Sequence, residues 1–194
     1  REESPKTDDL KRTCMTIYNL EKIFKPSSVA IIGASEKQGS IGHALVRNLQ
    51  KGGYKGKIVP INPNYRVIRG LNAYPSIGDI GQAVDLAVIA TPMKTVPSII
   101  RKCVKAGVGG AIIIAAGGKE TGQKGRKIEA AIKKEAEKGG IRIIGPNCVG
   151  VISAGVNLYA TFANQMPLPG KMAFISQSGA LIGPILDLSL RHNI

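Results

Sequence analysis

The sequence is poor in aromatic and acidic residues, and both shortages narrow the functions open to it. Only 4% of its 194 residues are aromatic and tryptophan is absent, so base-stacking surfaces typical of single-strand nucleic-acid binders are scarce. There are 27 basic residues and 13 acidic ones, a formal charge of +14. The basic residues are spread along the chain rather than concentrated on one reading element. The sequence therefore predicts a polyanionic small-molecule ligand rather than nucleic acid.

Cysteine is also scarce, and long apolar runs are missing. Cys14, Cys103 and Cys148 are widely spaced and form no CxxC pair, which indicates neither a disulfide framework nor a zinc site. No apolar run approaches the roughly 20 residues that a membrane span needs, and the polar start does not resemble a signal peptide. We therefore expect a cytoplasmic protein that contacts no membrane and binds no metal through this chain.

Short apolar runs alternate with amphipathic segments through most of the chain. The runs are nearly continuous in their hydrophobicity and cover residues 28–32, 57–61, 86–90, 110–116 and 142–144. Helical spacing or helix-like composition lies between them, at residues 41–50, 75–83, 95–105 and 124–138. Strands buried on both faces have such unalternating runs. The sequence therefore predicts an α/β fold with a Rossmann-like, doubly wound parallel sheet.

The chain is expected to divide into four parts. Residues 1–16 are charged and aperiodic and predict an N-terminal extension. Residues 17–150 hold the Rossmann-like domain, and residues 151–169, with glycine, asparagine and proline, are expected to form an interdomain connection. Residues 170–194 predict the first strand, at 172–175, and the first helix of a second domain. One strand and one helix cannot bury a core, so we expect this second domain to be truncated or completed by another chain.

A glycine-rich loop after the first predicted strand is the main candidate for phosphate binding. Glycine lets the backbone approach an anion, and the N-terminus of the following helix offers free N–H groups. The glycines at 33, 39 and 42 are spaced more widely than in the GxGxxG pattern of NAD-binding proteins. Serine hydroxyls and one lysine add polar groups. The candidate residues are Gly33, Ala34, Ser35, Lys37, Gln38, Gly39, Ser40 and Ile41.

The turn after the second predicted strand lacks the acidic residue that NAD-binding proteins usually place on the ribose. Residues 51–70 include five basic residues and no acidic one. The turn therefore fits a ribose phosphate, as in coenzyme A or NADP, better than it fits NAD. The alternative is that Arg66 and Arg69 are solvated surface residues. The candidate binding residues are Asn62, Pro63, Asn64, Tyr65 and Arg66.

Small residues follow the next two predicted strands, at the edge of the sheet where ligands bind. Such small residues would leave room for a long ligand arm. The alternative is that they only form turns. The candidate residues are Thr91, Pro92, Ala115, Ala116 and Gly117. A second phosphate cradle, in which a turn precedes a helix, is predicted at residues 176–179. A Walker A loop is excluded because Gln123 stands where its lysine belongs. A nucleophile elbow is disfavoured because Ser176 stands where its glycine belongs.

Cys148 and His43 are the side chains that suggest catalysis most readily. No histidine lies near Cys148 in the sequence, and His43 belongs to no motif. We interpret Cys148 as a small buried residue and His43 as a helix residue beside the loop. No catalytic residue is therefore predicted within this chain.

Several motifs in this order resemble the N-terminal CoA-binding part of the NDP-forming acyl-CoA synthetases. This superfamily includes ADP-forming acetate–CoA ligase and the α subunit of succinyl-CoA synthetase. The resemblance extends from about residue 20 to the end. It is carried by the sequences VAIIGAS, NP, ATP, GPNCVG and FISQSGA, at residues 29–35, 62–63, 90–92, 145–150 and 174–180.

The resemblance implies coenzyme A bound by residues 35–40, 62–66, 91–92 and 115–117. It implies a flavodoxin-like second domain and an acid–thiol ligase that forms an acyl phosphate and then a phosphohistidine outside this chain. ATP, ADP and Mg2+ would be bound by an ATP-grasp domain or subunit within an oligomer, with a small carboxylic acid, acetate above all, as substrate. This chain alone would be inactive. Residues implied to dock phosphate or the phosphohistidine are Asn147, Ser176, Gln177, Ser178 and Gly179.

One segment departs from the family pattern. Residues 115–118, Ala-Ala-Gly-Gly, replace a pattern that contains serine or threonine and is followed by an acid, and Glu120 is the candidate to replace that acid. Contacts to the pantetheine arm are therefore left open. Two other functions also stay open: a regulatory CoA-binding module of a protein acetyltransferase, and an NADP-binding Rossmann domain.

Overall fold

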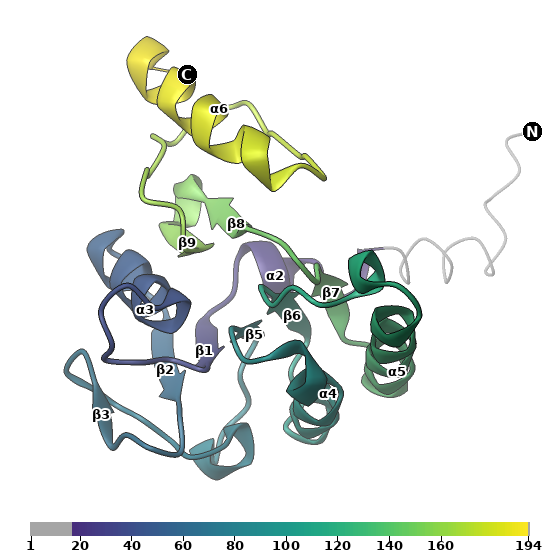
Figure 1. The fold of residues 1–194 in the computed structure, drawn as a ribbon. Helices are drawn as coiled ribbons and strands as arrows, with labels where there is room; N and C mark the ends of the chain where they lie inside the picture. The colour runs from purple at the N-terminus through teal and green to yellow at the C-terminus, as the bar shows by residue number, and fades with distance from the viewer. Residues whose placement is uncertain (1–16, 194) are drawn as a thin grey trace, which may run out of the picture.

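Five parallel strands form the central sheet of the computed structural model, which describes residues 17–193 (Figure 1). Their spatial order is β2-β1-β5-β6-β7, and each neighbouring pair is parallel. All five lie within the apolar runs, so the predicted Rossmann-like parallel sheet is confirmed. Their bounds are β1 (Ser28–Ile32), β2 (Lys57–Ile61), β5 (Leu86–Ile89), β6 (Gly110–Ile113) and β7 (Arg142–Ile144).

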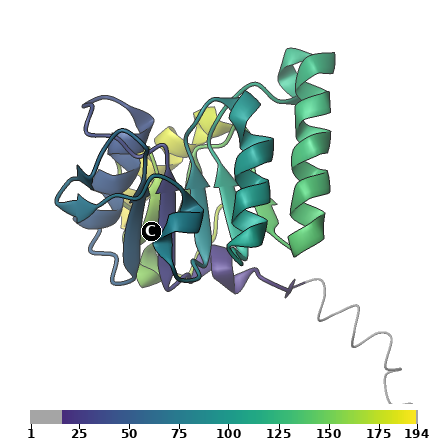
Figure 2. The same ribbon diagram turned by 90° about the horizontal axis from the view of Figure 1, so that it is seen from below.

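Helices cover both faces of this sheet (Figure 2). One face packs against α2 (Glu21–Phe24) and α3 (Ile41–Lys51). The other face packs against α4 (Val96–Lys105) and α5 (Gln123–Gly139). Short 3-10 turns complete the connections at η1 (Ile77–Ile80), η2 (Met93–Thr95), η3 (Lys119–Thr121) and η4 (Ala154–Val156). The predicted helix at residues 75–83 is therefore only the single turn η1.

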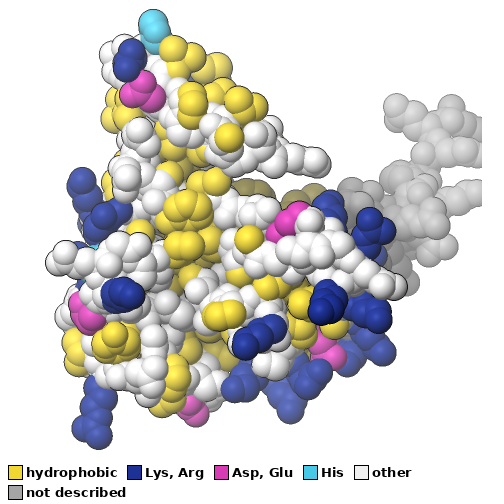
Figure 3. Space-filling view, viewed as in Figure 1, with side chains coloured by type: hydrophobic (Ala, Val, Ile, Leu, Met, Phe, Trp, Pro, Cys, Tyr) yellow, Lys and Arg dark blue, Asp and Glu magenta, His cyan; other side chains and the backbone are white. Residues whose placement is uncertain are grey.

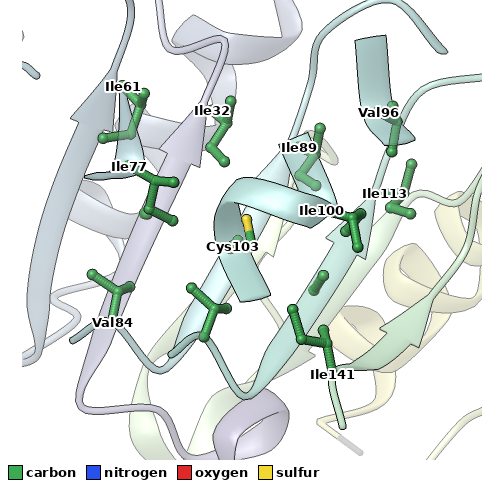
Figure 4. Packing of buried hydrophobic residues seen from close by; sticks show 14 of the residues in the cluster. Ile32, Ile61, Ile77, Val84, Ile89, Val96, Ile100, Cys103, Ile113 and Ile141 are labelled. Atoms are coloured by element: carbon green, nitrogen blue, oxygen red, sulfur yellow. The ribbon is translucent and has the colours of Figure 1, made fainter. Parts of the chain in front are cut away.

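The strands serve two cores at once. Val29 and Ile31 of β1 belong to the core on the α3 side, whereas Ile32 packs into the core on the α4 side. There Ile100 and Cys103 of α4 lie over the sheet among other aliphatic side chains (Figure 4). Because successive side chains of a strand point to opposite faces and both faces are covered, the strands are apolar beyond their first residues. This double burial explains the continuous hydrophobic runs.

Two antiparallel hairpins accompany the sheet: β3 (Val67–Ile68) with β4 (Leu71–Asn72), and β8 (Gly150–Ser153) with β9 (Leu158–Thr161). The second hairpin begins at Gly150 and otherwise lies in the segment 151–169, which we expected to form an interdomain connection. Its Leu158 is fully buried on the α3 side, and the Asn48 amide of α3 donates to the Thr161 and Ala163 carbonyls, both at 2.7 Å. The first part of this segment therefore packs on the Rossmann-like sheet.

The strand predicted at residues 172–175 does not form. Met172 and Ile175 are 72% and 95% exposed, and within residues 17–193 this stretch pairs with no strand. A strand needs a neighbour for its backbone hydrogen bonds, so an apolar pattern alone is insufficient. The helix that was expected next is present as α6 (Gly179–His192). The predicted extension at residues 1–16 lies outside the described residues.

Positive charge is concentrated on the outer side of α4 and α5, where Lys and Arg side chains gather (Figure 3). The linear sequence had suggested an even spread, but folding brings the basic positions of two separate helices together. None of the helices within residues 17–193 is long and apolar enough to cross a membrane. The exposed basic residues of α4 and α5 are Arg101, Lys102, Lys105, Lys124, Arg126, Lys127, Lys133, Lys134 and Lys138.

Candidate functional site

The loops predicted to bind a ligand follow neighbouring strands at the carboxyl edge of the sheet. The winding of the chain reverses between β1 and β5, and open α/β sheets bind ligands outside this switch point. Hydrogen bonds hold the strand ends together here. Gly33 N–H donates to the Ile61 carbonyl at 3.0 Å, and Ala90 N–H donates to the Ile32 carbonyl at 2.8 Å. The loops after β1, β2 and β5 therefore start side by side.

Two glycines bring the start of α3 directly against the end of β1. Gly33 has φ +91°, and a Cβ there would lie 2.9 Å from the Thr91 methyl group. A Cβ on Gly42 would overlap the carbonyl oxygen of Gly33. A side chain on Gly33 would push apart the loops after β1 and β5, and a side chain on Gly42 would push α3 away from the end of β1. These glycines thus fix how closely the helix approaches the strand.

Ser40 caps α3 and shapes the loop in front of it. Its Oγ accepts the His43 N–H at 3.2 Å and donates to the Lys37 carbonyl at 2.7 Å. Lys37 N–H donates to Ser35 Oγ at 3.0 Å. These bonds order the loop from within. Lys37 is exposed, and among the described residues its side chain makes no hydrogen bond or ion pair.

The same loop keeps donors that could hold an anion. Within residues 17–193, the backbone N–H groups of Gln38, Gly39 and Ile41 donate to no protein acceptor. Gly39 has φ +77°, and no heavy atom lies within 4 Å of the position that a Cβ would take there, so its surroundings are open. Free N–H groups at the N-terminus of an 11-residue helix suit a phosphate. The loop therefore fits the phosphate groups of a nucleotide-like ligand.

Asn62 joins the turn after β2 to this loop. Its side-chain amide donates to the Ala34 carbonyl at 2.7 Å, and its Oδ1 accepts the Asn64 N–H at 2.9 Å. Asn62 thus orders both segments. Arg66 is exposed, and among the described residues its side chain makes no hydrogen bond or ion pair. Its guanidinium is available to a ligand phosphate.

The loops after β5 and β6 lie further along the edge. The Thr95 hydroxyl donates to the Pro92 carbonyl at 2.7 Å and lies 3.0 Å from the Thr91 hydroxyl. After β6, the Glu120 carboxylate accepts the N–H groups of Gly117 and Gly118 at 2.7 and 3.1 Å. Glu120, the candidate to replace the acid of the family pattern, thus stabilises the Ala-Ala-Gly-Gly segment at residues 115–118.

The negative charge of Glu120 determines which part of a ligand could lie beside the loop after β6. The hydrogen bond from Gly117 N–H, with the other backbone donors and nearby Lys119, holds the pKa of Glu120 below its usual range. The group is therefore ionised at neutral pH, and it occupies N–H groups that would otherwise attract an anion. An uncharged ligand arm fits beside this loop better than a second phosphate does.

The residues predicted to dock a phosphate or phosphohistidine follow β7, the last strand of the central sheet. Asn147 N–H donates to the Ala115 carbonyl at 2.9 Å, which ties the loop after β7 to the loop after β6. At the start of α6, a Cβ on Gly179 would lie 3.0 Å from a Val149 methyl group. Ser176 Oγ accepts the Ser178 N–H at 3.0 Å. The second cradle therefore stands next to the loop after β7, while its own side chains are largely exposed.

Cys148 is a half-buried packing residue in this arrangement. Its Sγ donates to the Ile113 carbonyl at 3.2 Å, and burial raises the pKa of its thiol. A protonated thiol is a poor nucleophile, which agrees with the interpretation from the sequence. Among residues 17–193, no cluster of three or more His, Cys, Asp or Glu side chains could hold a metal ion.

Several polar residues near the loop escaped the sequence analysis. Glu36 of the loop accepts the backbone N–H of Arg69 at the tip of the β3–β4 hairpin. Arg69 in turn contacts Gln50 and His43 of α3. The partners are 19 to 33 residues apart in the chain, so no local motif marks them. The alternative that Arg69 is a solvated surface residue does not hold, because its side chain is bound to the protein.

Comparison with known families identifies the domain. A family model described as a CoA binding domain matches residues 27–154. This chain belongs to that CoA-binding domain family. The match spans the whole five-stranded sheet and the β1, β2, β5 and β6 loops described above. The resemblance that the motifs suggested is thereby confirmed.

Named relatives share the chain's sequence and its fold. The ADP-forming acetate–CoA ligase of Methanocaldococcus jannaschii is 46% identical over 177 residues, which are 91% of this chain and 25% of that protein. Subunit α of the ADP-forming acetate–CoA ligase I of Pyrococcus furiosus is 45% identical, with 84% of this chain and 36% of the subunit covered.

A solved relative extends the similarity to three dimensions. The acetyl-coenzyme A synthetase 1 of Ca. Korarchaeum cryptofilum, solved with phosphate and ADP, is 41% identical to this CoA-binding chain with a TM-score of 0.86. The match covers 90% of this chain and 37% of that one. The chain therefore spans about a quarter to two fifths of the relatives' lengths.

Proposed function

We propose that this chain is the CoA-binding portion of an ADP-forming acyl-CoA synthetase, with acetyl-CoA as the expected product. One observation carries the proposal: the free N–H groups of the loop at residues 37–41 lie beside the switch point of a domain in the CoA-binding family. The names of the relatives, acetate–CoA ligases that form ADP, support the acyl substrate and the nucleotide product.

Coenzyme A would span the carboxyl edge of the sheet. The loop after β1 would hold the pyrophosphate through its N–H groups and Lys37, and Arg66 would bind the ribose 3′-phosphate. The pantetheine arm would pass Thr91 and the loop at residues 115–117, where the ionised Glu120 disfavours phosphate. This chain's residues would bind and orient the thiol carrier, and the bound coenzyme would supply the thiol that accepts the acyl group.

The remaining chemistry is assigned to parts outside this chain. An ATP-grasp domain or subunit would bind ATP or ADP with Mg2+, and a phosphohistidine would dock at Asn147 and residues 176–179, within an oligomer. The name of the Pyrococcus furiosus relative, a subunit α, supports a division of labour between subunits. The residues 17–150 and 170–194 would then belong to two domains. The dispersed cysteines support a cytoplasmic location.

Calorimetric titration of the 194-residue chain with coenzyme A, dephospho-coenzyme A and NADP+ tests the proposal. We expect coenzyme A to bind more tightly than the dephospho form, and NADP+ to bind weakly. Arg66→Ala should weaken coenzyme A binding about tenfold and leave dephospho-coenzyme A nearly unchanged, because one phosphate contact is lost. Arg126→Ala on α5 is the matched control and should change neither. Binding of NADP+ without coenzyme A would overturn the proposal.

A further inference from the structure

The tip of the β3–β4 hairpin has an unusual residue for its conformation. Arg69 and Gly70 form the turn with φ of +51° and +77°. Two-residue hairpins of this kind favour glycine, asparagine or aspartate because both positions are left-handed. An arginine is disfavoured there by its Cβ. Glycine would therefore be less strained than arginine at position 69.

Arg69 is tied to α3 through three contacts. Its Nε donates to Gln50 Oε1 at 2.8 Å, and the Gln50 amide donates back to the Arg69 carbonyl at 2.9 Å. Its Nη1 lies 3.3 Å from His43 Nε2. His43 and Gln50 are seven residues apart, so they share one face of the helix. The hairpin tip is thus fastened along two turns of α3.

The backbone of the same residue is tied to the phosphate loop. The Glu36 carboxylate accepts the Arg69 N–H, and Glu36 lies between Ser35 and Lys37 in the loop after β1. Arg69 therefore connects three segments: the hairpin, α3 and the loop. We call this group of four residues, Glu36, His43, Gln50 and Arg69, the clasp.

His43 is held by the clasp through one of its two ring nitrogens. An arginine side chain is always a donor, so His43 Nε2 is the acceptor in the contact with Arg69. Within residues 17–193, the buried Nδ1 of the ring has no hydrogen-bond partner. A buried polar atom without a partner is uncommon. Among the described residues, Arg69 is therefore the one hydrogen-bond partner of the His43 ring.

We propose that the clasp positions the loop at residues 35–41 for the pyrophosphate of coenzyme A, with Arg69 as a positioning residue that does not touch the ligand. This inference rests on the proposed function. Glu36 holds one side of the loop, and the α3 N-terminus, beside His43, holds the other. A loop that is fixed on both sides before binding already holds the free N–H groups of Gln38 and Gly39 in place. The entropy that binding would otherwise lose in ordering this loop is therefore smaller.

Arg69→Gly removes the side-chain bonds to Gln50 and His43, whereas the backbone bonds of residue 69 to Glu36 and Gln50 can still form. Glycine suits the left-handed turn, so the melting temperature should stay within a few degrees of the parent or rise. Affinity for coenzyme A and for dephospho-coenzyme A should fall by the same factor, about tenfold, because the pyrophosphate loop is common to both. Arg66→Ala, in contrast, should affect coenzyme A alone. Unchanged affinity in Arg69→Gly, or a loss confined to coenzyme A, would overturn the positioning role.

A His43 pair provides the rescue test. His43→Gln keeps an acceptor for Arg69 and should hold coenzyme A affinity within about twofold, whereas His43→Leu should resemble Arg69→Gly. Equal effects of the two His43 substitutions would contradict the clasp.

Amide hydrogen exchange on the ligand-free chain distinguishes failure of the clasp from failure of the proposed function. Residues 36–41 should exchange faster in Arg69→Gly than in the parent, while β5 stays unchanged. If coenzyme A does not bind the parent chain but this exchange difference appears, the proposed function fails and the clasp as an ordering device stands. If the exchange rates are equal, the side chain of Arg69 does not order the loop, and its positioning role is rejected whatever the ligand.

Discussion

A single carboxylate joins the amino-terminal ends of the elements opposite the ligand edge. Asp85 precedes β5 and accepts Lys22 Nζ of α2 at 2.6 Å and the Ser27 N–H at 2.7 Å. Its own N–H donates to Ser28 Oγ at 3.0 Å. Asp85 therefore connects α2, β1 and β5 at one point.

The charge of Asp85 should contribute to stability in a pH-dependent way. Burial raises the pKa of this carboxyl, but the bonds from Lys22 and Ser27 outweigh burial and leave the pKa below its usual value. A lowered pKa in the folded state stabilises the protein above the unfolded pKa, about 4, and the contribution disappears as the pH falls through the folded pKa. The gain is therefore fully present at pH 7.

We predict that Asp85→Asn lowers the free energy of unfolding by about 1 kcal/mol at pH 7, since Lys22 is half-exposed and its ion pair is partly screened. The deficit should shrink as the pH falls from about 4 towards 2, through the lowered pKa of the parent carboxyl. Urea unfolding at pH 7 and at pH 2 measures it. Asp79→Asn, at an exposed position on η1, serves as the control and should have little effect. A deficit of equal size at both pH values would contradict the charge argument.

At the scale of elements, the sequence predicts the strands well because burial on two faces leaves an unambiguous apolar run. β1, β2 and β7 begin and end at the predicted residues. The β8–β9 hairpin escaped because its glycine and asparagine resemble a linker, although Asn157 is a left-handed turn residue with φ +56°. The strand expected at residues 172–175 was wrong because pairing depends on a neighbour, which composition cannot supply.

Part of the candidate site could be predicted from the sequence and part of it could not. The loops after β1, β2, β5 and β6 were predictable, because parallel strands place every carboxyl end at one edge. The clasp was not, because Glu36 and Arg69 meet only after the β3–β4 hairpin folds over α3. Glu120 was recognised as a candidate acid, but its acceptor role towards Gly117 and Gly118 required the loop conformation.

Gly42 lies where α3 comes closest to the end of β1, and a substitution there tests this close approach. Gly42→Ala places a methyl group where the Gly33 carbonyl lies, so α3 must move away from the sheet edge. We expect a loss of about 2–3 kcal/mol in unfolding free energy and weaker coenzyme A binding, although alanine itself favours helix by about 1 kcal/mol. Thermal unfolding and calorimetry measure both effects.

Gly78→Ala is the matched control for that substitution. No heavy atom lies within 4 Å of a Cβ at Gly78, which is on the exposed turn η1. Its stability should stay within about 0.5 kcal/mol of the parent, with unchanged coenzyme A binding. If Gly42→Ala behaved like this control, the close approach of α3 to β1 would not matter for the site.

At the scale of the whole molecule, the central sheet and the C-terminal helix α6 differ in how deeply they are buried. The sheet strands β1, β5 and β6 are almost completely buried, whereas no residue of α6 is buried. Apolar residues of α6 such as Leu181 and Leu188 are about half exposed, at 51% and 49%. Pro184 lies inside the helix and removes one backbone hydrogen bond. Local opening of α6 should therefore need much less free energy than opening of the sheet.

Native-state hydrogen exchange of the 194-residue chain should resolve this difference. Amides of β1, β5 and β6 should open only with global unfolding, whereas α6 amides should exchange at least about a hundredfold faster through local opening. Mild denaturant should then accelerate exchange in the sheet far more than in α6, because only global opening exposes much buried surface. Protection of α6 equal to that of β5, with the same denaturant dependence, would mean that α6 unfolds together with the Rossmann-like sheet. The close approach of Gly179 to Val149 would then be part of a larger stabilising interface.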